Sequence, residues 1–553
     1  MLLLTLLLFA AAATAQAQCT TTWNGTALAG ALEDGACRFS VRYGSAQRWG
    51  YSAFASSQAD INAADYPPIC PQPGWEQSVI PLPKQRLIED CLMAVVWAPA
   101  GANASSALPV FVWLHGGSFV AGSASDSGLN GAPLAAEGVL TVFVQYRLGA
   151  LGLLPPPEAA SSADPNLAVL DVILALRVVR DNIAAVGGDP RRVTLGGQSA
   201  GASMNYGAQS RQNQLDLQDY FYRNANTSLF PHCADMACYN NISLPTLLAW
   251  QSYVNNTAPF LLSGVAFGEV YRPQYGTQTI PHDPTNALWA GNLSRLAINT
   301  SIPVLATTLK NEAGYLVGVL LPVPIPASSQ LANFTLRKLM GQERANTVLE
   351  SGLYPLQAGP DGLRQTIDYI ITDAAWHCVT RSLFRRWAAA GGKAYLGTFT
   401  RGLPYLFNAN NDYCVLPGVV CHGDDLYPTF STLANPSPEN ATFQDDIRAY
   451  WTSFIKTGSP STAAHPWPQW GANSTDADVN NLGKGRDVPV CPVDFWGTKV
   501  PFEFQLFSSN DTGILAAPGN GTAGAGKSPG RGARGAAVAL GAVVVAAAGL
   551  LVV

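Results

Sequence analysis

Short apolar runs separated by turn-forming residues recur along the chain, and one longer apolar stretch has helical spacing. That stretch runs from Leu167 to Ile183 and predicts a helix, which Gly187 and Gly188 terminate. The short runs are rich in β-branched and aromatic residues, which is typical of buried strands. The predicted strands cover residues 110–114, 193–195, 302–308 and 394–400.

The run at 193–195 leads directly into the sequence G-Q-S-A-G at 197–201, and small residues follow where a helix should begin. This pattern is typical of a nucleophile elbow, a sharp strand-to-helix turn that would project the hydroxyl of Ser199 above the sheet edge. Glycine suits positions 197 and 201 because larger side chains would collide with the neighbouring turn. The chain contains 52 glycines, so a glycine-rich turn with an incidental serine is the alternative. The motif therefore needs support from elsewhere in the chain.

The predicted strand at 110–114 supplies some of that support, because it ends in His115, Gly116 and Gly117. A glycine-rich loop at the end of a buried strand can direct backbone N–H groups at an oxyanion. Further motifs are E-D-C-L at 89–92, Y-R-L-G-A-L-G at 146–152 and N-I-A-A-V-G-G-D-P at 182–190.

Together with V-T-L-G-G-Q-S-A-G-A at 193–202, these motifs have the order and spacing of the type-B carboxylesterase family, which the chain resembles. The family includes cholinesterases and carboxylester lipases. The resemblance implies an α/β-hydrolase fold, with a doubly wound, mostly parallel sheet and helices on both faces. We expect it to form one domain over residues 19–507.

The resemblance also implies the rest of a catalytic triad, in the order serine, acid, histidine. Glu312 lies in N-E-A-G, where the family usually has D-E-G, and is the expected acid; the alternative is a solvated loop glutamate. His422 lies in H-G-D-D-L and is the expected base; the alternative is a structural histidine. Gly116, Gly117 and Ala200 would form the oxyanion hole, and no metal or organic cofactor is implied. His115 belongs to the H-G-G loop, and the histidines without matching context are His232, His282, His377 and His465.

Two other polar residues are expected to be structural. Asp171 lies in the middle of the apolar helix pattern, where an unpaired charge would be costly, and the resemblance offers Arg147 as its partner. Glu89 is likewise expected to belong to an ion pair.

The ten cysteines are an even number in a chain with secretory features, which favours disulfides over zinc or redox chemistry. A zinc site is disfavoured because no C-x-x-C pair occurs and the six histidines are scattered. The resemblance suggests Cys70–Cys91, Cys233–Cys238 and Cys378–Cys491. Pairing Cys19 with Cys37 and Cys414 with Cys421 would use the remainder, but this assignment stays open.

The two ends of the sequence predict an extracellular protein at a membrane. Residues 1–17 are typical of a secretory signal. A Gly/Ala/Ser/Pro-rich spacer at 508–535 precedes an apolar tail at 536–553, which is typical of a GPI-anchor signal, with a retained membrane span as the alternative. A net charge of −5 with 12% charged residues gives no basic surface for nucleic acid. Sequons for N-glycosylation begin at Asn24, Asn103, Asn226, Asn241, Asn255, Asn292, Asn299, Asn333, Asn440, Asn473, Asn510 and Asn520.

One departure from the family follows the elbow. Family members continue through a longer helix to another sheet strand, whereas residues 203–216 soon become polar and no apolar run appears before Cys233. The chain therefore lacks a segment of some tens of residues, including an interior strand. True divergence, an erroneous gene model or alternative splicing would each explain this. If the strand is absent from the protein, the sheet has a gap beside the nucleophile.

A second departure concerns the substrate. Cholinesterases have a tryptophan about ten residues before the cysteine of E-D-C-L, where it stacks on choline. Pro81 holds that position here, Trp75 is displaced, and Gln198 replaces the acidic residue before the nucleophile. We therefore expect a general carboxylic ester hydrolase acting on small-molecule or lipid esters. A lipase, recognisable by a rise in rate once its substrate forms an interface, is the next alternative among enzymes. The alternative from another class is a catalytically impaired, cholinesterase-like adhesion or binding protein of the cell surface. The oligomeric state stays open.

Overall fold

The computed structural model describes residues 19–58, 61–73, 87–204, 208–223, 230–262, 268–284, 299–483, 488–492 and 495–500. The predicted signal sequence, spacer and apolar tail lie outside these ranges, as do Trp75 and Pro81.

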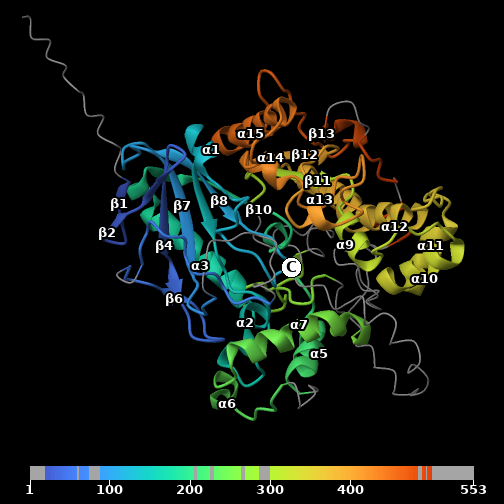
Figure 1. The fold of residues 1–553 in the computed structure, drawn as a ribbon, viewed down its shortest axis with the longest axis horizontal. Helices are drawn as coiled ribbons and strands as arrows, with labels where there is room; N and C mark the ends of the chain where they lie inside the picture. The colour runs from blue at the N-terminus through green and yellow to red at the C-terminus, as the bar shows by residue number, and fades with distance from the viewer. Residues whose placement is uncertain are drawn as a thin grey trace, which may run out of the picture.

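A six-stranded sheet forms the centre of the N-terminal half, in the order β10-β8-β9-β7-β4-β3 (Figure 1). Strands β10, β8 and β9 run parallel to one another, while β7, β4 and β3 are each antiparallel to their neighbours. The sheet is therefore mixed, with its parallel part beside the predicted elbow. The strands are β3 (Ala31–Glu33), β4 (Ala36–Arg42), β7 (Met93–Pro99), β8 (Leu108–Leu114), β9 (Leu140–Val144) and β10 (Gly188–Gly197).

Both faces of this sheet are covered, as the alternation of side chains along β8 demonstrates. Val110, Val112 and Leu114 belong to a core shared with α3 (Leu167–Asn182) and α7 (Leu244–Leu261). Phe111 and Trp113 belong to the core of the opposite face, which α1 (Ala132–Ala136) and α14 (Leu426–Phe430) also line. Successive residues of a strand point to opposite faces, so a strand buried on both sides is apolar throughout. The expected α/β class, with helices on both faces, is confirmed.

A separate sheet of three parallel strands carries the later part of the chain. It consists of β11 (Val304–Leu309), β12 (Ala394–Phe399) and β13 (Asn480–Asn481). Strands β11 and β12 are in register from Val304 opposite Ala394 to Leu309 opposite Phe399. Each of the two sheets contains parallel strands, and these strands pair only within their own sheet.

Strand β10 has no partner on its outer edge among the described residues, and neither has β11. The side chains of Val193 and Leu195 on β10 are 38% and 43% exposed. In the middle of β10, Arg192 donates to the carbonyl of Lys456 at 3.3 Å, so the C-terminal end of α15 (Pro438–Thr457) lies near this edge. Among the described residues, no strand fills the gap that the sequence predicts beside the nucleophile.

The helices surround these sheets, with α5–α7 on one side and α10–α13 at the far end from the N-terminal strands (Figure 1). They are α1 (Ala132–Ala136), α2 (Gly149–Leu153), α3, α4 (Ala200–Ser203), α5 (Arg211–Tyr222), α6 (Met236–Asn240), α7, α9 (Gly314–Leu320), α10 (Ser329–Met340), α11 (Gln342–Glu350), α12 (Gly362–Thr372), α13 (Cys378–Ala389), α14 (Leu426–Phe430) and α15 (Pro438–Thr457). Two small hairpins pair β1 (Thr20–Trp23) with β2 (Thr26–Ala29) and β5 (Gly44–Ser45) with β6 (Ala53–Phe54).

Ion pairs connect these elements, one of them buried. Arg147 contacts Asp171 through Nε at 2.8 Å and Nη2 at 2.7 Å, which satisfies the carboxylate inside α3. Glu89 pairs with Arg48, whose Nε lies 2.9 Å from its Oε2. No helix in the described ranges has the length and apolar character needed to cross a membrane. The disulfides are Cys19–Cys37, Cys70–Cys91, Cys233–Cys238, Cys378–Cys491 and Cys414–Cys421.

Candidate active site

Ser199 occupies a sharp turn between β10 and α4. Its backbone has φ 55° and ψ −124°, a conformation that non-glycine residues rarely adopt. A Cβ at position 197 would lie 2.6 Å from the carbonyl carbon of Gly201, and a Cβ at 201 would lie 2.2 Å from the carbonyl oxygen of Leu114. Both glycines are therefore required by close backbone approach. This is the geometry of a nucleophile elbow.

The H-G-G loop lies directly against this turn. A Cβ at Gly116 would come within 3.0 Å of the Cβ of Ser199, and Gly117 has a φ of +114° that favours glycine. Within the described ranges the backbone N–H groups of Gly116, Gly117 and Ala200 donate no hydrogen bond to the protein. Three uncommitted donors beside a serine can stabilise an oxyanion. His115 is stacked on Tyr146, and burial lowers its pKa to about 4, so it is neutral.

Glu312 lies in the loop that follows β11. We refer to this loop together with the last residue of the strand, residues 309–313, as the acid loop. Glu312 Oε1 accepts from the backbone N–H of Leu309 at 2.9 Å. Asn311 forms an isolated bridge with Cys421, in which its N–H donates to Val420 O at 2.9 Å. The acid loop is thereby attached to the segment that carries His422.

That segment is held by its own contacts. Asn408 donates to the backbone carbonyl of His422 at 2.8 Å and to Asp424 at 2.7 Å. Asp424 also accepts from the N–H of Cys421 at 2.9 Å, and the Cys414–Cys421 disulfide closes the preceding loop. Because the backbone on both sides of His422 is fixed, its ring has a defined direction.

The ring of His422 connects the acid to the elbow. Its Nδ1 lies 2.5 Å from Glu312 Oε2, while its Nε2 faces the side-chain amide of Gln198 at 3.1 Å. Burial alone would lower the pKa of His422, but the charge and hydrogen bond of Glu312 outweigh it, so the pKa lies above its ordinary value. With Nδ1–H donating to the carboxylate, Nε2 carries the lone pair, and Gln198 donates to it.

Ser199 Oγ forms no hydrogen bond with His422 among the described contacts, because Gln198 occupies the acceptor. Hydrogen bonds between nucleophile and base are often loose before substrate binds. The structure thus brings Glu312, His422, Gly116, Gly117 and the elbow to one place, with Gln198 as an additional contact that the motif alone does not indicate.

Further acidic groups surround the base. Asp425 is buried next to His422, and burial, followed by repulsion from Glu312, raises its pKa to about 7. Glu269 also interacts with His422, and its pKa is raised by burial. No group of three or more potential metal ligands occurs in the ranges described.

Two residues near the site lack any family motif. The ring of Trp376 lies 6.0 Å from that of His422, and His377 contacts the acid loop from behind. Both belong to a π-helical turn, Asp373–His377, between α12 and α13. The sequence indicates the contact between these two residues' helix and the site only through the pair D-x-x-x-H at 373–377. This spacing is common in ordinary helices, so it does not distinguish the turn.

Comparisons with known proteins agree with this geometry. The chain matches the Carboxylesterase family over residues 46–214 and 232–488. Para-nitrobenzyl esterase of Bacillus subtilis is 30% identical over 437 residues, covering 74% of this chain and 83% of that protein. Carboxylesterase 1C of Mus musculus is 27% identical over 450 residues, covering 74% and 77%.

Solved structures give the same fold. A thermophilic PNB esterase has a TM-score of 0.65 at 24% identity, covering 82% of this chain and 94% of that one. A PNB esterase has a TM-score of 0.62 at 25% identity, with the same coverage. The family predicted from the motifs is confirmed: this chain belongs to the carboxylesterase family and has its α/β-hydrolase fold.

Proposed function

We propose that the protein is a serine carboxylic ester hydrolase in which Ser199, His422 and Glu312 form the catalytic triad. The observation that carries the proposal is the position of His422, whose Nδ1 meets Glu312 at 2.5 Å while its Nε2 faces the elbow residue Gln198. Ester hydrolysis itself is supported by family membership. The serine mechanism is the further step.

In this mechanism Ser199 Oγ attacks the carbonyl carbon of the ester while His422 Nε2 takes its proton. Glu312 stabilises the imidazolium that forms. The N–H groups of Gly116, Gly117 and Ala200 hold the oxyanion, where losing one donor typically costs about 3 kcal/mol of barrier. The tetrahedral intermediate collapses, the C–O bond breaks, and His422 gives its proton to the leaving alcohol.

Water then completes the cycle. It attacks the acyl-enzyme carbonyl while His422 accepts one of its protons, and collapse of the second intermediate releases the acid and returns the proton to Ser199. Before the first step, the hydroxyl of Ser199 must replace the Gln198 amide at Nε2. No metal or organic cofactor takes part in any step that we propose.

Hydrolysis of p-nitrophenyl butyrate by the wild type and single variants tests the proposal. We expect Ser199→Ala and His422→Ala to lower kcat by about 10⁴-fold or more. Glu312→Gln should reduce it on the order of 10⁴-fold, because the ring loses its charged partner. His465→Gln is the matched control, since His465 contacts Asp446 on α15 rather than the triad. Unchanged hydrolysis by Ser199→Ala would contradict the mechanism.

The pH profile gives a second readout. The base must be neutral to accept a proton, so kcat/KM should fall as the pH drops through the pKa of His422. Because Glu312 raises that pKa, the midpoint should lie above the ordinary histidine value of about 6.5. In Glu312→Gln the midpoint should move to lower pH.

A second candidate is the catalytically impaired binding or adhesion protein. The observation that favours it is the outer edge of β10, which has no strand partner within the described ranges and exposes Val193 and Leu195. A folded protein that hydrolyses no ester would support this alternative.

The proposed setting is the outside of the cell. Five disulfides are typical of an oxidising compartment. We further propose a single catalytic domain over residues 19–507, acting on small-molecule or lipid esters, with attachment to a membrane through a GPI anchor or the apolar tail.

A further inference from the structure

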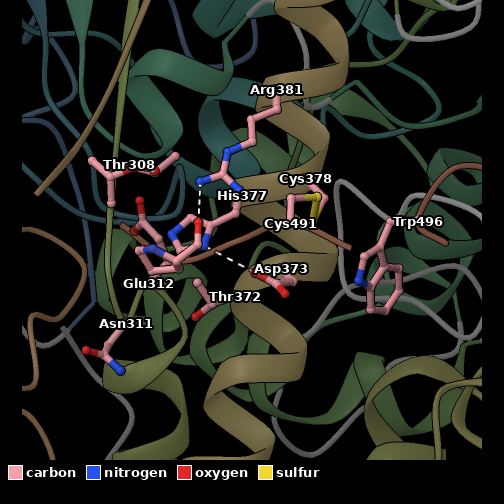
Figure 2. A network of polar contacts seen from close by, with 12 residues as sticks. Thr308, Asn311, Glu312, Thr372, Asp373, His377, Cys378, Arg381, Cys491 and Trp496 are labelled. Carbon is pink, nitrogen blue, oxygen red and sulfur yellow. Dashed lines mark hydrogen bonds and ion pairs between the residues drawn. A yellow bond between two sulfur atoms is a disulfide. The ribbon is translucent and has the colours of Figure 1, made fainter. Parts of the chain in front are cut away.

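A single long helix lies directly behind the acid loop. Helix α12 continues through the π-helical turn Asp373–His377 into α13, as Figure 2 shows beside Glu312 and Thr308. A π turn holds an extra residue, and such turns are frequent at functional sites. Here the extra residue lets two consecutive side chains reach the site: Trp376 lies beside the ring of His422 and His377 lies behind the acid loop.

His377 is connected to the catalytic acid through Leu309. Its Nε2 lies 2.9 Å from the carbonyl oxygen of Leu309. The N–H of the same residue donates to Glu312 Oε1 at 2.9 Å, and Glu312 Oε2 meets His422 at 2.5 Å. The backbone of one residue therefore lies between His377 and the proposed triad.

The same helix holds the acid loop at two other residues. Thr372 Oγ1 accepts from the backbone N–H of Ala313 at 3.0 Å, and Asp368 accepts from the amide of Asn311 at 2.5 Å. These two contacts hold the residues directly before and after Glu312. Of the three contacts from this helix, only the one from His377 holds the last residue of β11, Leu309.

The partners of His377 define its protons. Leu309 O can only accept, so Nε2 carries a hydrogen. Nδ1 lies 3.2 Å from Asp373 Oδ1. Asp373 is held in turn by the hydroxyl of Tyr354 at 2.8 Å, which accepts from the indole of Trp496 at 2.6 Å. His377 and Asp373 therefore form a buried contact, with the side chain of His377 1% exposed.

A pocket of about 320 Å³ lies beside this pair, lined by Lys310, Tyr354, Asp373 and His377 among others. A buried His–Asp pair adds little net stability, because desolvation offsets much of its attraction, and an apolar side chain could fill the same volume. Its hydrogen bond to the strand end that carries the acid therefore calls for another role.

We propose that His377 is a positioning residue that, through the backbone of Leu309, holds Glu312 against the ring of His422. The inference rests on the proposed triad and deepens it. Asp373 contacts Nδ1 at 3.2 Å and so orients the imidazole with its Nε2 toward Leu309. Without this donor, the end of β11 gains freedom and the Glu312 carboxylate loses its fixed distance from His422, although no group that touches substrate has changed.

The test compares two replacements of His377 in the full-length protein. His377→Leu removes the donor, whereas the amide nitrogen of Gln reaches the position of Nε2, so His377→Gln can still donate to Leu309. Rates of p-nitrophenyl butyrate hydrolysis are divided by the fraction of molecules that a fluorophosphonate labels at Ser199. We expect His377→Leu to lower kcat by about 10- to 100-fold with KM within about twofold, as losses of supporting contacts typically do. His377→Gln should stay within about threefold of the wild type.

The pH profile separates positioning from general destabilisation. His422 is faced by Glu312, Asp425 and Glu269, and Glu312 is the strongest of these in raising its pKa. If Glu312 moves away, the midpoint of the acidic limb of kcat/KM should shift to lower pH in His377→Leu. Arg385→Gln is the matched control: Arg385 lies on α13 about two turns beyond His377, donates to the carbonyl of Ser474 at 3.2 Å, and its replacement should leave kcat and the midpoint unchanged.

Asp373→Asn serves if His377→Leu does not fold. It leaves His377 in place but removes the carboxylate, and we expect a smaller fall in kcat in the same direction. Suppose that the wild type is labelled at Ser199, but His377→Leu has the same kcat and the same midpoint as the wild type. That result would overturn this inference and leave the proposed function standing, and the same holds for Asp373→Asn where it replaces His377→Leu. A folded wild type without label at Ser199 would overturn the proposed function and the inference with it.

Discussion

At the scale of single residues, Asp368 occupies a position that is costly for its charged form. Its side chain is fully buried and accepts from Asn311 at 2.5 Å, from the hydroxyl of Tyr413 at 2.9 Å and from Thr372 at 3.0 Å. These neutral donors only partly replace water, so burial raises the pKa of Asp368 to about 6. The carboxylate that supports the acid loop is therefore destabilised in its charged form.

This position predicts a pH-dependent stability. An acid whose pKa is higher in the folded than in the unfolded state stabilises fully below its unfolded pKa, near 3.9, and this contribution is lost as the pH rises through about 6. A shift of about two units corresponds to about 3 kcal/mol. Between pH 4 and 7 the unfolding free energy of Asp368→Asn should therefore rise by about that amount relative to the wild type. Urea titrations at several pH values measure this, and a constant difference would contradict it.

The sequence predicts the residues with motif context better than those without it. Ser199 and Glu312 follow from short patterns because each comes shortly after a strand that apolar residues identify, and His422 follows from the pattern H-G-D-D-L. The sequence shows Gln198 only as a replacement, because its contact with His422 depends on how distant segments of the chain meet. His377 could not be found, because its role arises from a π turn and a backbone carbonyl, neither of which leaves a distinctive pattern.

Among elements, strand β10 is exceptional. It carries the nucleophile at its end, yet its outer edge has no partner among the described residues, and Val193 and Leu195 are exposed there. An exposed apolar strand edge offers free N–H and C=O groups to other chains. The polar run after Ser203 predicts that the family strand is missing. The separation into two sheets could not be predicted from the sequence, because no local pattern indicates which strands fail to pair.

We therefore expect concentration-dependent self-association through β10. Leu195→Lys should weaken it, because a charged side chain on an edge opposes pairing with another strand. Leu331→Lys on α10 is the matched control, as Leu331 is 44% exposed but lies on a helix. Sedimentation velocity over a range of concentrations measures the effect. Equal association of the two variants would show that the β10 edge is not the contact.

At the scale of the whole molecule, the disulfides differ greatly in the length of chain that they close. Cys378 and Cys491 are 113 residues apart and connect the start of α13 with the last described segments, whereas Cys233 and Cys238 are only five apart. A cross-link stabilises mainly by restricting the unfolded chain, more so for longer loops. The long link should therefore contribute most to keeping the C-terminal part attached.

Replacing both cysteines of a pair by alanine tests this difference. Removal of Cys378–Cys491 should lower the unfolding free energy by about 5 kcal/mol, and removal of Cys233–Cys238 by about 2 kcal/mol, from loop length alone. Denaturant titrations of the two double variants measure both values. Equal losses would mean that loop closure does not account for the stabilisation.

The most direct measurement of the central claim is covalent labelling of the folded protein with a fluorophosphonate, followed by mass spectrometry of its peptides. An activated serine attacks phosphorus, displaces fluoride and keeps the phosphonyl group. We predict one adduct, on Ser199, lost in Ser199→Ala and slowed in His422→Ala. A well-folded protein in which Ser199 stays unlabelled would contradict the assignment of this chain as a serine hydrolase.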